Sequence, residues 1–220
     1  MRPHLATLLD DFRRLGAQRA VVHHTGNRAL PCTYAELADY SARFAAEYLR
    51  QQIQPGDRIL LWGQNSAAWI AAFYGCVLRG ILVVPLDAAG DPRFADRVIA
   101  ETTPRLIIGD LVLLAKMAPS AIARLSLATP VQQLPPPTPE PVAGLNRSTP
   151  LQIIFTSGTT SEPKGVVHTH GNVLASLDPV EREIRRYLRY ERLVHPLRFL
   201  HTLPLSHVFG QFMGLWCLPC

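Results

Sequence analysis

The residues best suited to chemistry lie in one short segment that follows an apolar run. From Phe155 to Asn172 the chain reads FTSGTTSEPKGVVHTHGN, which brings hydroxyl side chains, glycines and one lysine close together. Hydroxyls and glycine-freed backbone N–H groups in a loop after a strand can converge on phosphate oxygens, and Lys164 adds a mobile positive charge. The segment is therefore a candidate phosphate site, while the same composition also suits a flexible turn.

A proline separates this segment from the Walker phosphate loop, whose pattern is GxxxxGK[ST]. Counted from Gly158, the second glycine of that pattern would fall on Pro163, and its final hydroxyl residue would fall on Gly165. Proline has no N–H to donate and disfavours the helical region for the residue before it. We therefore expect the loop to lead into a strand rather than into a phosphate-capping helix.

The segments ahead of this loop alternate between helix and strand patterns. A helix is expected from Thr33, because Thr33 and Glu36 have capping-box spacing, and a buried strand is expected at about 58–63. The next segment predicts a helix that is capped by Asn65 or Ser66 and ended by Gly80. Further strands at 81–87 and 105–110 and helices at 91–102 and 111–118 continue the alternation. This order predicts an α/β fold with a mainly parallel sheet flanked by helices on both faces.

The sequence divides into three parts. Residues 1–133 are expected to form an N-terminal α/β subdomain, residues 134–150 a proline-rich connector, and residues 151–220 the phosphate-loop segment. The last part predicts strands at 151–155 and 165–169, a long helix that continues past Pro179, another strand, a loop at 204–207 and a final helix. That final helix is apolar almost all round and needs covering. We expect this to be the front part of a longer protein, or a chain that self-associates through its apolar C-terminal end.

The formal net charge of +5 raises the question of an acidic partner. Much of the excess lies in one helical pattern, where Arg182, Arg185, Arg186 and Arg189 share a face with interleaved glutamates. A solvated helix face is favoured, with weak contact to a membrane surface or to a partner protein as the alternatives. No nucleic-acid partner is expected.

The four cysteines are too few and too scattered for a disulfide framework, so reduced thiols are expected. Cys217 and Cys220 are interpreted as apolar residues rather than as a zinc or redox motif. No metal site is predicted, and the histidine pairs His23/His24 and His168/His170 are interpreted as structural. The sequence has no signal-peptide pattern and no apolar run that could span a bilayer, which predicts a cytoplasmic location.

One stretch resembles a known family. TSGTTSEPKG is similar to the signature loop of the adenylate-forming (AMP-binding) superfamily, which includes acyl-CoA synthetases, acyl-AMP ligases, luciferases and peptide-synthetase adenylation domains. PGDRILLWGQNSAAWIAAFYGCVLRG resembles the units before that loop, and LPLSHVFG resembles the next block of the family. Ser161 departs from the pattern, since glycine is commonest there. The wording of EREIRRYLRYERLVHP and LPLSHVFG most resembles long-chain fatty-acyl ligases, so the chain looks like the N-terminal part of an acyl-CoA synthetase or fatty-acyl-AMP ligase.

The resemblance implies a reaction and a set of site residues. A carboxylic acid, with a fatty acid expected, would attack Mg-ATP to give an acyl adenylate, and the thiol of CoA or phosphopantetheine would then displace AMP. Lys164 and His207 would be catalytic, and His207, Phe209 and Gly210 would shape the substrate pocket. The phosphate-binding set would be Thr156, Ser157, Gly158, Thr159, Thr160, Ser161, Lys164 and Gly165.

Parts of the family's machinery are missing from these residues. Nothing resembles the block that packs the adenine and supplies a glutamate for magnesium, the aspartate that holds the ribose, or the lysine of the mobile C-terminal domain. We therefore expect the magnesium ligand to lie outside this chain and the isolated 220 residues to be inactive. The alternative hypothesis is a non-catalytic module of the same fold that binds nucleotide or a partner protein.

Overall fold

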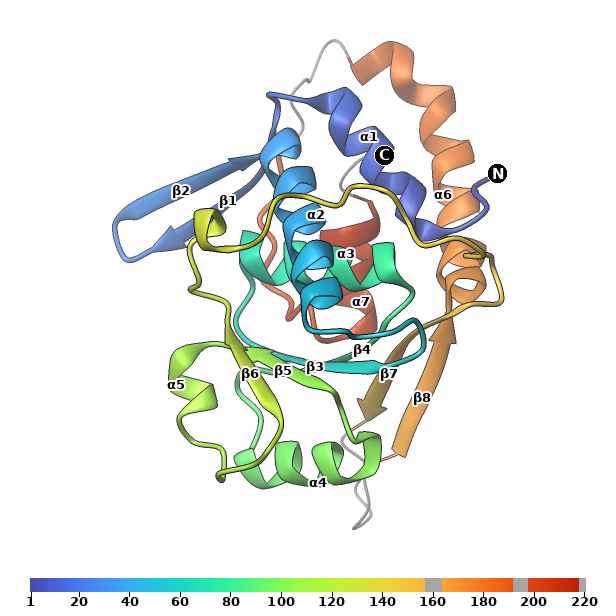
Figure 1. Cartoon of the computed structure of the whole chain (residues 1–220). Helices are drawn as coiled ribbons and strands as arrows, with labels where there is room; N and C mark the ends of the chain where they lie inside the picture. Colours follow the sequence, from blue (N-terminus) through green and yellow to red (C-terminus); the bar gives the residue numbers. More distant parts are fainter. Residues whose placement is uncertain (157–163, 192–197, 218–220) are drawn as a thin grey trace.

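The centre of the molecule is a six-stranded sheet with strand order β6-β5-β3-β4-β7-β8, seen in a computed structural model that describes residues 1–156, 164–191 and 198–217 (Figure 1). The strands are β3 (Arg58–Trp62), β4 (Leu82–Leu86), β5 (Leu106–Gly109), β6 (Ala123–Ser126), β7 (Pro150–Thr156) and β8 (Lys164–Thr169). All neighbouring pairs are parallel except β7 and β8, which are antiparallel. The predicted mainly parallel α/β fold is confirmed.

Helices cover both faces of this sheet, because alternate residues of its strands point to opposite sides. Ile59 and Leu61 of β3 belong to a core that also contains α2 (Tyr34–Arg50) and α3 (Ala67–Arg79). Leu60 and Trp62 belong to a second core with α4 (Pro92–Thr102) and α5 (Leu111–Leu114). Figure 1 shows α2 and α3 above the sheet, α4 below it and α5 beside β6.

The helix ends are set by the residues that the sequence predicts. The Thr33 side chain accepts a hydrogen bond from the Glu36 N–H, and the Glu36 carboxylate accepts one from the Thr33 N–H, which makes a capping box for α2. Ser66 caps α3, and Gly80 ends it with a φ of 64°, where glycine has no steric penalty.

Several elements differ from the expectation. The sequence did not predict the helix α1 (Leu8–Leu15), the hairpin of β1 (Arg19–Thr25) and β2 (Arg28–Thr33), the short edge strand β6, or the 3-10 turns Leu5–Thr7 and Val131–Gln133. The predicted helix at 111–118 is only the four residues of α5. The strand predicted ahead of Pro204 is wrong, since residues 198–203 contain no strand; the Leu203 carbonyl instead accepts from the Asn65 side chain.

The connector lies against the two central helices. Thr138 donates its N–H to Ala42 O of α2, and Val142 donates to Leu78 O of α3, at 2.9 and 2.8 Å. Its prolines cannot continue a helix or an interior strand, and residues 135–149 contain neither. The connector is thus a surface excursion that is hydrogen-bonded to the domain.

The last described helical turns pack against α3 of the same chain. After α7 (Val208–Gln211), a π-helical turn (Phe212–Trp216) buries Leu215 and Trp216, and the Trp216 ring meets Phe73 and Tyr74 of α3 edge to face. Val208 and Phe209 remain exposed. In the parts of the chain that the structure describes, no helix has the length and apolar composition needed to cross a membrane.

The N-terminus docks on α6 (His170–Glu191), which continues past Pro179 as predicted. The buried His170 ring accepts a hydrogen bond at Nδ1 from the Leu5 N–H, 3.1 Å away, and the His4 ring lies edge-on to it. Arg2 joins this contact to both helices through Asp11 of α1 and Glu181 of α6. Burial first, and the neighbouring His4 second, lower the pKa of His170 to about 4.

We expect the Gly75→Ala substitution to destabilise the protein. A Cβ at position 75 would lie 2.8 Å from Phe44 Cβ and 3.1 Å from Ala45 N, where α2 and α3 are in close contact. Overpacking of this kind costs about 1–3 kcal/mol, whereas helix propensity alone would stabilise by about 1 kcal/mol. Urea unfolding gives the sign directly, and a more stable variant would contradict the close packing.

We also expect the protein to become less stable as the pH is lowered, because of His170. Its folded pKa is lower than the ordinary value of 6.5, so its stabilising contribution is complete above pH 6.5 and is lost as the pH falls toward about 4. The loss is on the order of a few kcal/mol. Urea unfolding of His170→Asn between pH 4 and 7.5 should show a flatter dependence than wild type, while the same change at the exposed His24 should not.

Candidate functional site at the carboxyl edge of the sheet

The candidate site lies where two parallel strands end side by side. Val83 of β4 pairs with Gln152 of β7 in parallel register. Asp87 and Thr156 each follow their paired residue by four positions, so both come to the same edge of the sheet. Ligands of parallel α/β sheets bind at this carboxyl edge.

The ends of the predicted phosphate loop meet at this edge. Thr156 and Lys164 are cross-strand partners in the β7–β8 ladder, and Lys164 is exposed. The strand that was expected after Pro163 is present as β8. The other predicted phosphate-binding residues of the loop, Ser157, Gly158, Thr159, Thr160 and Ser161, lie outside the described residues.

Gly165 has a packing role beside the loop. It pairs with Phe155, and a Cβ at this position would lie 2.8 Å from Ile153 Cγ2 and 2.9 Å from Phe155 Cζ. A larger residue would push the Phe155 ring aside. The glycine therefore allows β8 to lie close to the last residues of β7.

His207 also reaches this edge, where it contacts an acidic residue that sequence reasoning missed. Its Nε2 lies 3.0 Å from Asp87 Oδ2, and the His207 side chain is 59% exposed. Partial burial raises the pKa of Asp87, but the Ala89 N–H and His207 more than offset this, so its pKa lies below the usual value. An aspartate directly after a buried parallel strand was the available signal for Asp87.

Two features fix the loop that carries His207. The Asn65 side chain donates to Leu203 O at 2.7 Å and accepts from the Leu205 N–H at 2.9 Å. Gly210 sits under the Pro204 carbonyl, where an added Cβ would lie 2.0 Å from the oxygen. The predicted pocket residue Gly210 thus shapes the loop through its backbone, whereas Phe209 has an exposed side chain.

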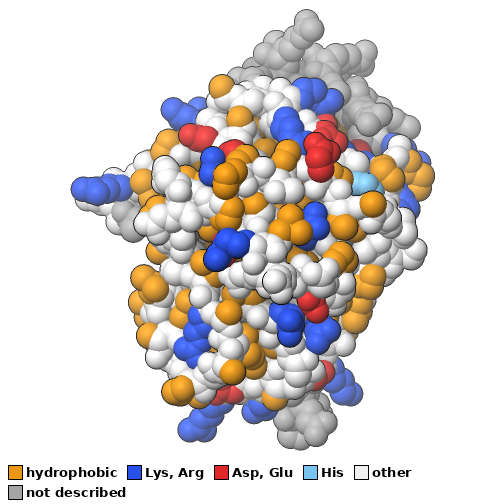
Figure 2. Space-filling model, in the orientation of Figure 1, with side chains coloured by type: hydrophobic (Ala, Val, Ile, Leu, Met, Phe, Trp, Pro, Cys, Tyr) orange, Lys and Arg blue, Asp and Glu red, His pale blue; other side chains and the backbone are white. Residues whose placement is uncertain are grey.

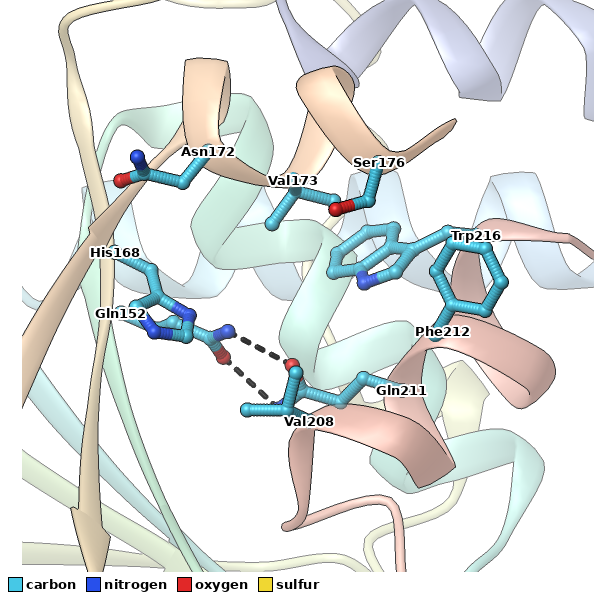
Figure 3. A pocket seen from close by; sticks show the side chains of 9 residues that line it. All are labelled: Gln152, His168, Asn172, Val173, Ser176, Val208, Gln211, Phe212 and Trp216. Carbon is cyan, nitrogen blue, oxygen red and sulfur yellow. Dashed lines mark hydrogen bonds between the residues drawn. The ribbon is translucent and has the colours of Figure 1, made fainter. Parts of the chain in front are cut away.

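A cavity of about 110 Å³ lies between β7, β8, α6 and α7 (Figure 3). Its walls combine polar and apolar side chains: Gln152, His168, Asn172, Val173, Ser176, Val208, Gln211, Phe212 and Trp216. Figure 3 shows the Gln152 and Gln211 side chains facing one another at one end, with Trp216 and Phe212 at the other. His168, which was interpreted as structural, lines this cavity, and Phe209 does not.

Charge is spread over the surface rather than gathered at one place on the face in view. Figure 2 shows Lys and Arg side chains scattered among acidic and apolar ones over several elements. Of the predicted arginine face, Arg182 is exposed, while the side chains of Arg185, Arg186 and Arg189 lie outside the described residues. Within residues 1–156, 164–191 and 198–217, no group of three His, Cys, Asp or Glu side chains could hold a metal ion.

The chain belongs to the AMP-binding enzyme family, whose model matches residues 11–219. Feruloyl-CoA synthase of Amycolatopsis sp. is 31% identical over 210 residues, which cover 94% of this chain and 40% of that protein. Malformin synthetase mlfA of Aspergillus tubingensis is 28% identical over 190 residues, which cover 86% of this chain and 4% of that protein. The chain therefore spans less than half the length of these relatives.

Solved structures share the fold. The nonribosomal peptide synthetase FmoA3 superposes with a TM-score of 0.75 at 25% identity, over 97% of this chain and 22% of that chain. The inhibitor-bound N-terminal domain of FACL13 from Mycobacterium tuberculosis gives a TM-score of 0.77 at 22% identity, over 99% of this chain and 55% of that chain. The architecture is thus that of the N-terminal subdomain of adenylate-forming enzymes.

We expect Gly210→Ala to destabilise the loop that carries His207. The new methyl group would overlap the Pro204 carbonyl oxygen, and such overpacking costs about 1–3 kcal/mol. Phe209→Ala is the matched control in the same helix, since truncation of this exposed side chain should change stability by no more than about 0.5 kcal/mol. Equal unfolding midpoints in urea for Gly210→Ala and wild type would refute the close contact.

Proposed function

We propose that this chain provides the phosphate-binding half of an ATP-dependent ligase that activates a carboxylic acid as its acyl adenylate and transfers the acyl group to a thiol. The observation that carries the proposal is the meeting of two pairs at one sheet edge: Thr156 with Lys164, and Asp87 with His207. The first pair brackets a loop suited to phosphate, and the second presents an imidazole to an incoming anion. Membership of the AMP-binding family supports this assignment.

Lys164 is assigned to the phosphates that leave as pyrophosphate. When a carboxylate attacks the α-phosphorus, negative charge moves onto the leaving pyrophosphate, and a nearby ammonium group stabilises that charge. The antiparallel pairing of β7 with β8 fixes the backbone of Lys164 beside that of Thr156. In this proposal, the hydroxyl and N–H groups of the segment between these two residues bind the polyphosphate.

His207 is assigned to the carboxylate substrate. The His207 imidazole, whose Nε2 lies 3.0 Å from the Asp87 carboxylate, attracts an acid anion in its protonated form. Asp87 stays ionised because its pKa is lowered. In this proposal, the pair orients the acid toward the nucleotide.

Magnesium and the thiol acceptor are further parts of the proposal. Mg²⁺ would neutralise phosphate charge when bound, but the described residues contain no cluster of acidic side chains that could hold it, so we assign it no ligand here. The acceptor would be CoA or a phosphopantetheine arm. The name of the relative feruloyl-CoA synthase fits CoA.

Two classes of acid follow from different observations. The sequences of the segments at 181–196 and 203–210 resemble those of long-chain fatty-acyl ligases, and this resemblance favours a fatty acid. Feruloyl-CoA synthase is named for an aromatic acid, and the cavity combines the Phe212 and Trp216 rings with polar side chains, which favours a compact aromatic acid. A substrate panel must therefore contain both classes.

The alternative is a non-catalytic module that binds nucleotide or a partner through the same fold. It shares the phosphate loop with the ligase, so nucleotide binding does not separate the two. Acid-dependent exchange of pyrophosphate into ATP does, because it requires a reversible adenylation step.

We expect Lys164→Ala to lower acid-dependent pyrophosphate exchange by about 10²–10³-fold, the usual effect of removing one group that stabilises transition-state charge. The assay uses the product of the complete reading frame that encodes this chain, with fatty acids and hydroxycinnamic acids as substrates. Lys116→Ala is the matched control, because Lys116 is the chain's other lysine and is also exposed. It should leave exchange unchanged.

Two results would contradict the proposal. If the wild-type protein binds ATP but none of the acids supports pyrophosphate exchange, the chain is the non-catalytic binding module and not part of a ligase. If Lys164→Ala and Lys116→Ala have the same effect, the loop is not the pyrophosphate site.

A further inference from the structure

A pair of buried amides joins the strand that enters the phosphate loop to the helix that follows His207. Gln152 lies within β7 with no exposed surface, and Gln211 ends α7 with 1% exposed. Gln152 Nε2 donates to Gln211 Oε1 at 2.8 Å, and Gln211 Nε2 donates to Gln152 Oε1 at 2.9 Å. Figure 3 draws both hydrogen bonds at the end of the cavity.

The reciprocal geometry makes each amide depend on the other. A buried amide without a partner is costly, while two apolar side chains of similar size can replace a satisfied pair at little cost. Leu151 and Ile154, on either side along β7, are apolar and buried, so packing alone does not require amides at this place. What the pair adds is direction, because hydrogen bonds fix relative orientation and apolar contacts do not.

α7 has only four residues and continues directly into the π-helical turn Phe212–Trp216, so contacts with the rest of the molecule must hold it. Helices this short have little stability of their own. The segment before it is held by the Asn65 side chain, which bonds Leu203 O and the Leu205 N–H. The segment from 203 to 211 is thus held by the Asn65 amide near its start and by the Gln152 amide at its end, and His207 lies between these two contacts.

The contact of His207 with Asp87 cannot supply this anchoring by itself. The His207 side chain is 59% exposed and that of Asp87 is 34% exposed. Ion pairs at such exposure contribute little, because water screens them. The position of the imidazole must therefore come from the contacts on either side of it, which are those of the half-buried Asn65 amide and of the buried glutamine pair.

We propose that Gln152 and Gln211 are positioning residues, which hold α7, and through it His207, in register with the strand that leads into the phosphate loop. This inference rests on the proposed function, since the group that His207 orients is the carboxylate of that reaction. The pair links the acid-binding and phosphate-binding segments directly, over 59 positions of sequence. Neither glutamine needs to touch the reacting atoms.

The test is a double-mutant cycle in the product of the complete reading frame. Gln152→Leu, Gln211→Leu and the double variant are compared with wild type for unfolding midpoint, for KM and kcat in pyrophosphate exchange, and for hydrogen exchange of peptides from 203–216. Ser41→Ala is the matched control, because it removes another buried hydrogen bond, from Ser41 Oγ to Leu37 O in α2, away from the site.

We expect each single variant to lose stability and the double variant to recover most of it. The double variant should still show a KM for the acid that is raised about 10- to 100-fold, the scale of effect of a misplaced catalytic group, with KM for ATP little changed. Its α7 amides should exchange faster than those of wild type, and Ser41→Ala should change neither the KM values nor the exchange at 203–216.

A double variant with wild-type kinetics and wild-type exchange at 203–216 would overturn the inference and leave the proposed function intact. If none of the acids supports pyrophosphate exchange by the wild-type protein, the proposed function fails. Amide hydrogen exchange then still decides whether the glutamine pair holds α7. If the double variant does not fold, Gln211→Glu replaces it: its carboxyl can return the hydrogen bond only when protonated. The measurement is the ratio of the amide hydrogen-exchange rate of α7 in Gln211→Glu to that in wild type. A higher ratio at neutral pH than at pH 5 supports the inference, and equal ratios overturn it.

Discussion

The parallel register of β4 and β7 is the constraint on which the site depends. Because Val83 pairs with Gln152 in parallel, the residues that follow both strands arrive at one edge, and Asp87 comes level with the start of the proposed phosphate loop. The register is held by the two apolar layers, since Val83 packs on one face of the sheet and Val84 on the other. A slip of one residue would turn each strand's side chains toward the wrong layer. The packing of the core therefore determines the geometry of the edge.

Side-chain amides hold the irregular segment at 203–211 in place against this edge. Loops have unsatisfied backbone groups that helices and strands do not, and Asn65 supplies both a donor and an acceptor to Leu203 and Leu205. Gln152 and Gln211 act in the same way at the other end, between side chains. Apolar contacts could hold this segment as firmly, but they would fix its orientation relative to the sheet less well. The polar groups are thus placed where orientation matters more than burial.

Local patterns predicted the elements that position the site, and long-range pairing accounts for most of what they missed. The Thr33 capping box, the Gly80 C-cap and the apolar strands β3 to β5 are readable because each signal lies within a few residues. The β1–β2 hairpin was missed because Val22 and Leu30 are exposed and leave no clear buried face, and β6 because it is a short edge strand with exposed residues. Asp87 and His207 are 120 positions apart, and only the register of the sheet brings them together. The strand expected before Pro204 failed for a related reason: a β pattern needs an edge to pair with, and the Leu203 carbonyl is taken by Asn65.

The charged groups at this edge differ from the amides in how their strength depends on water. Lys164 is exposed and His207 is 59% exposed, so their interactions operate at a dielectric close to that of water. At 4 Å a unit charge pair is worth about 1 kcal/mol in water and about 4 kcal/mol at the surface of a protein, and more once water is excluded. The same residues therefore become strong only when a substrate or further protein covers them. The buried glutamine pair is already shielded from water, so it can fix the geometry of this segment before a substrate binds.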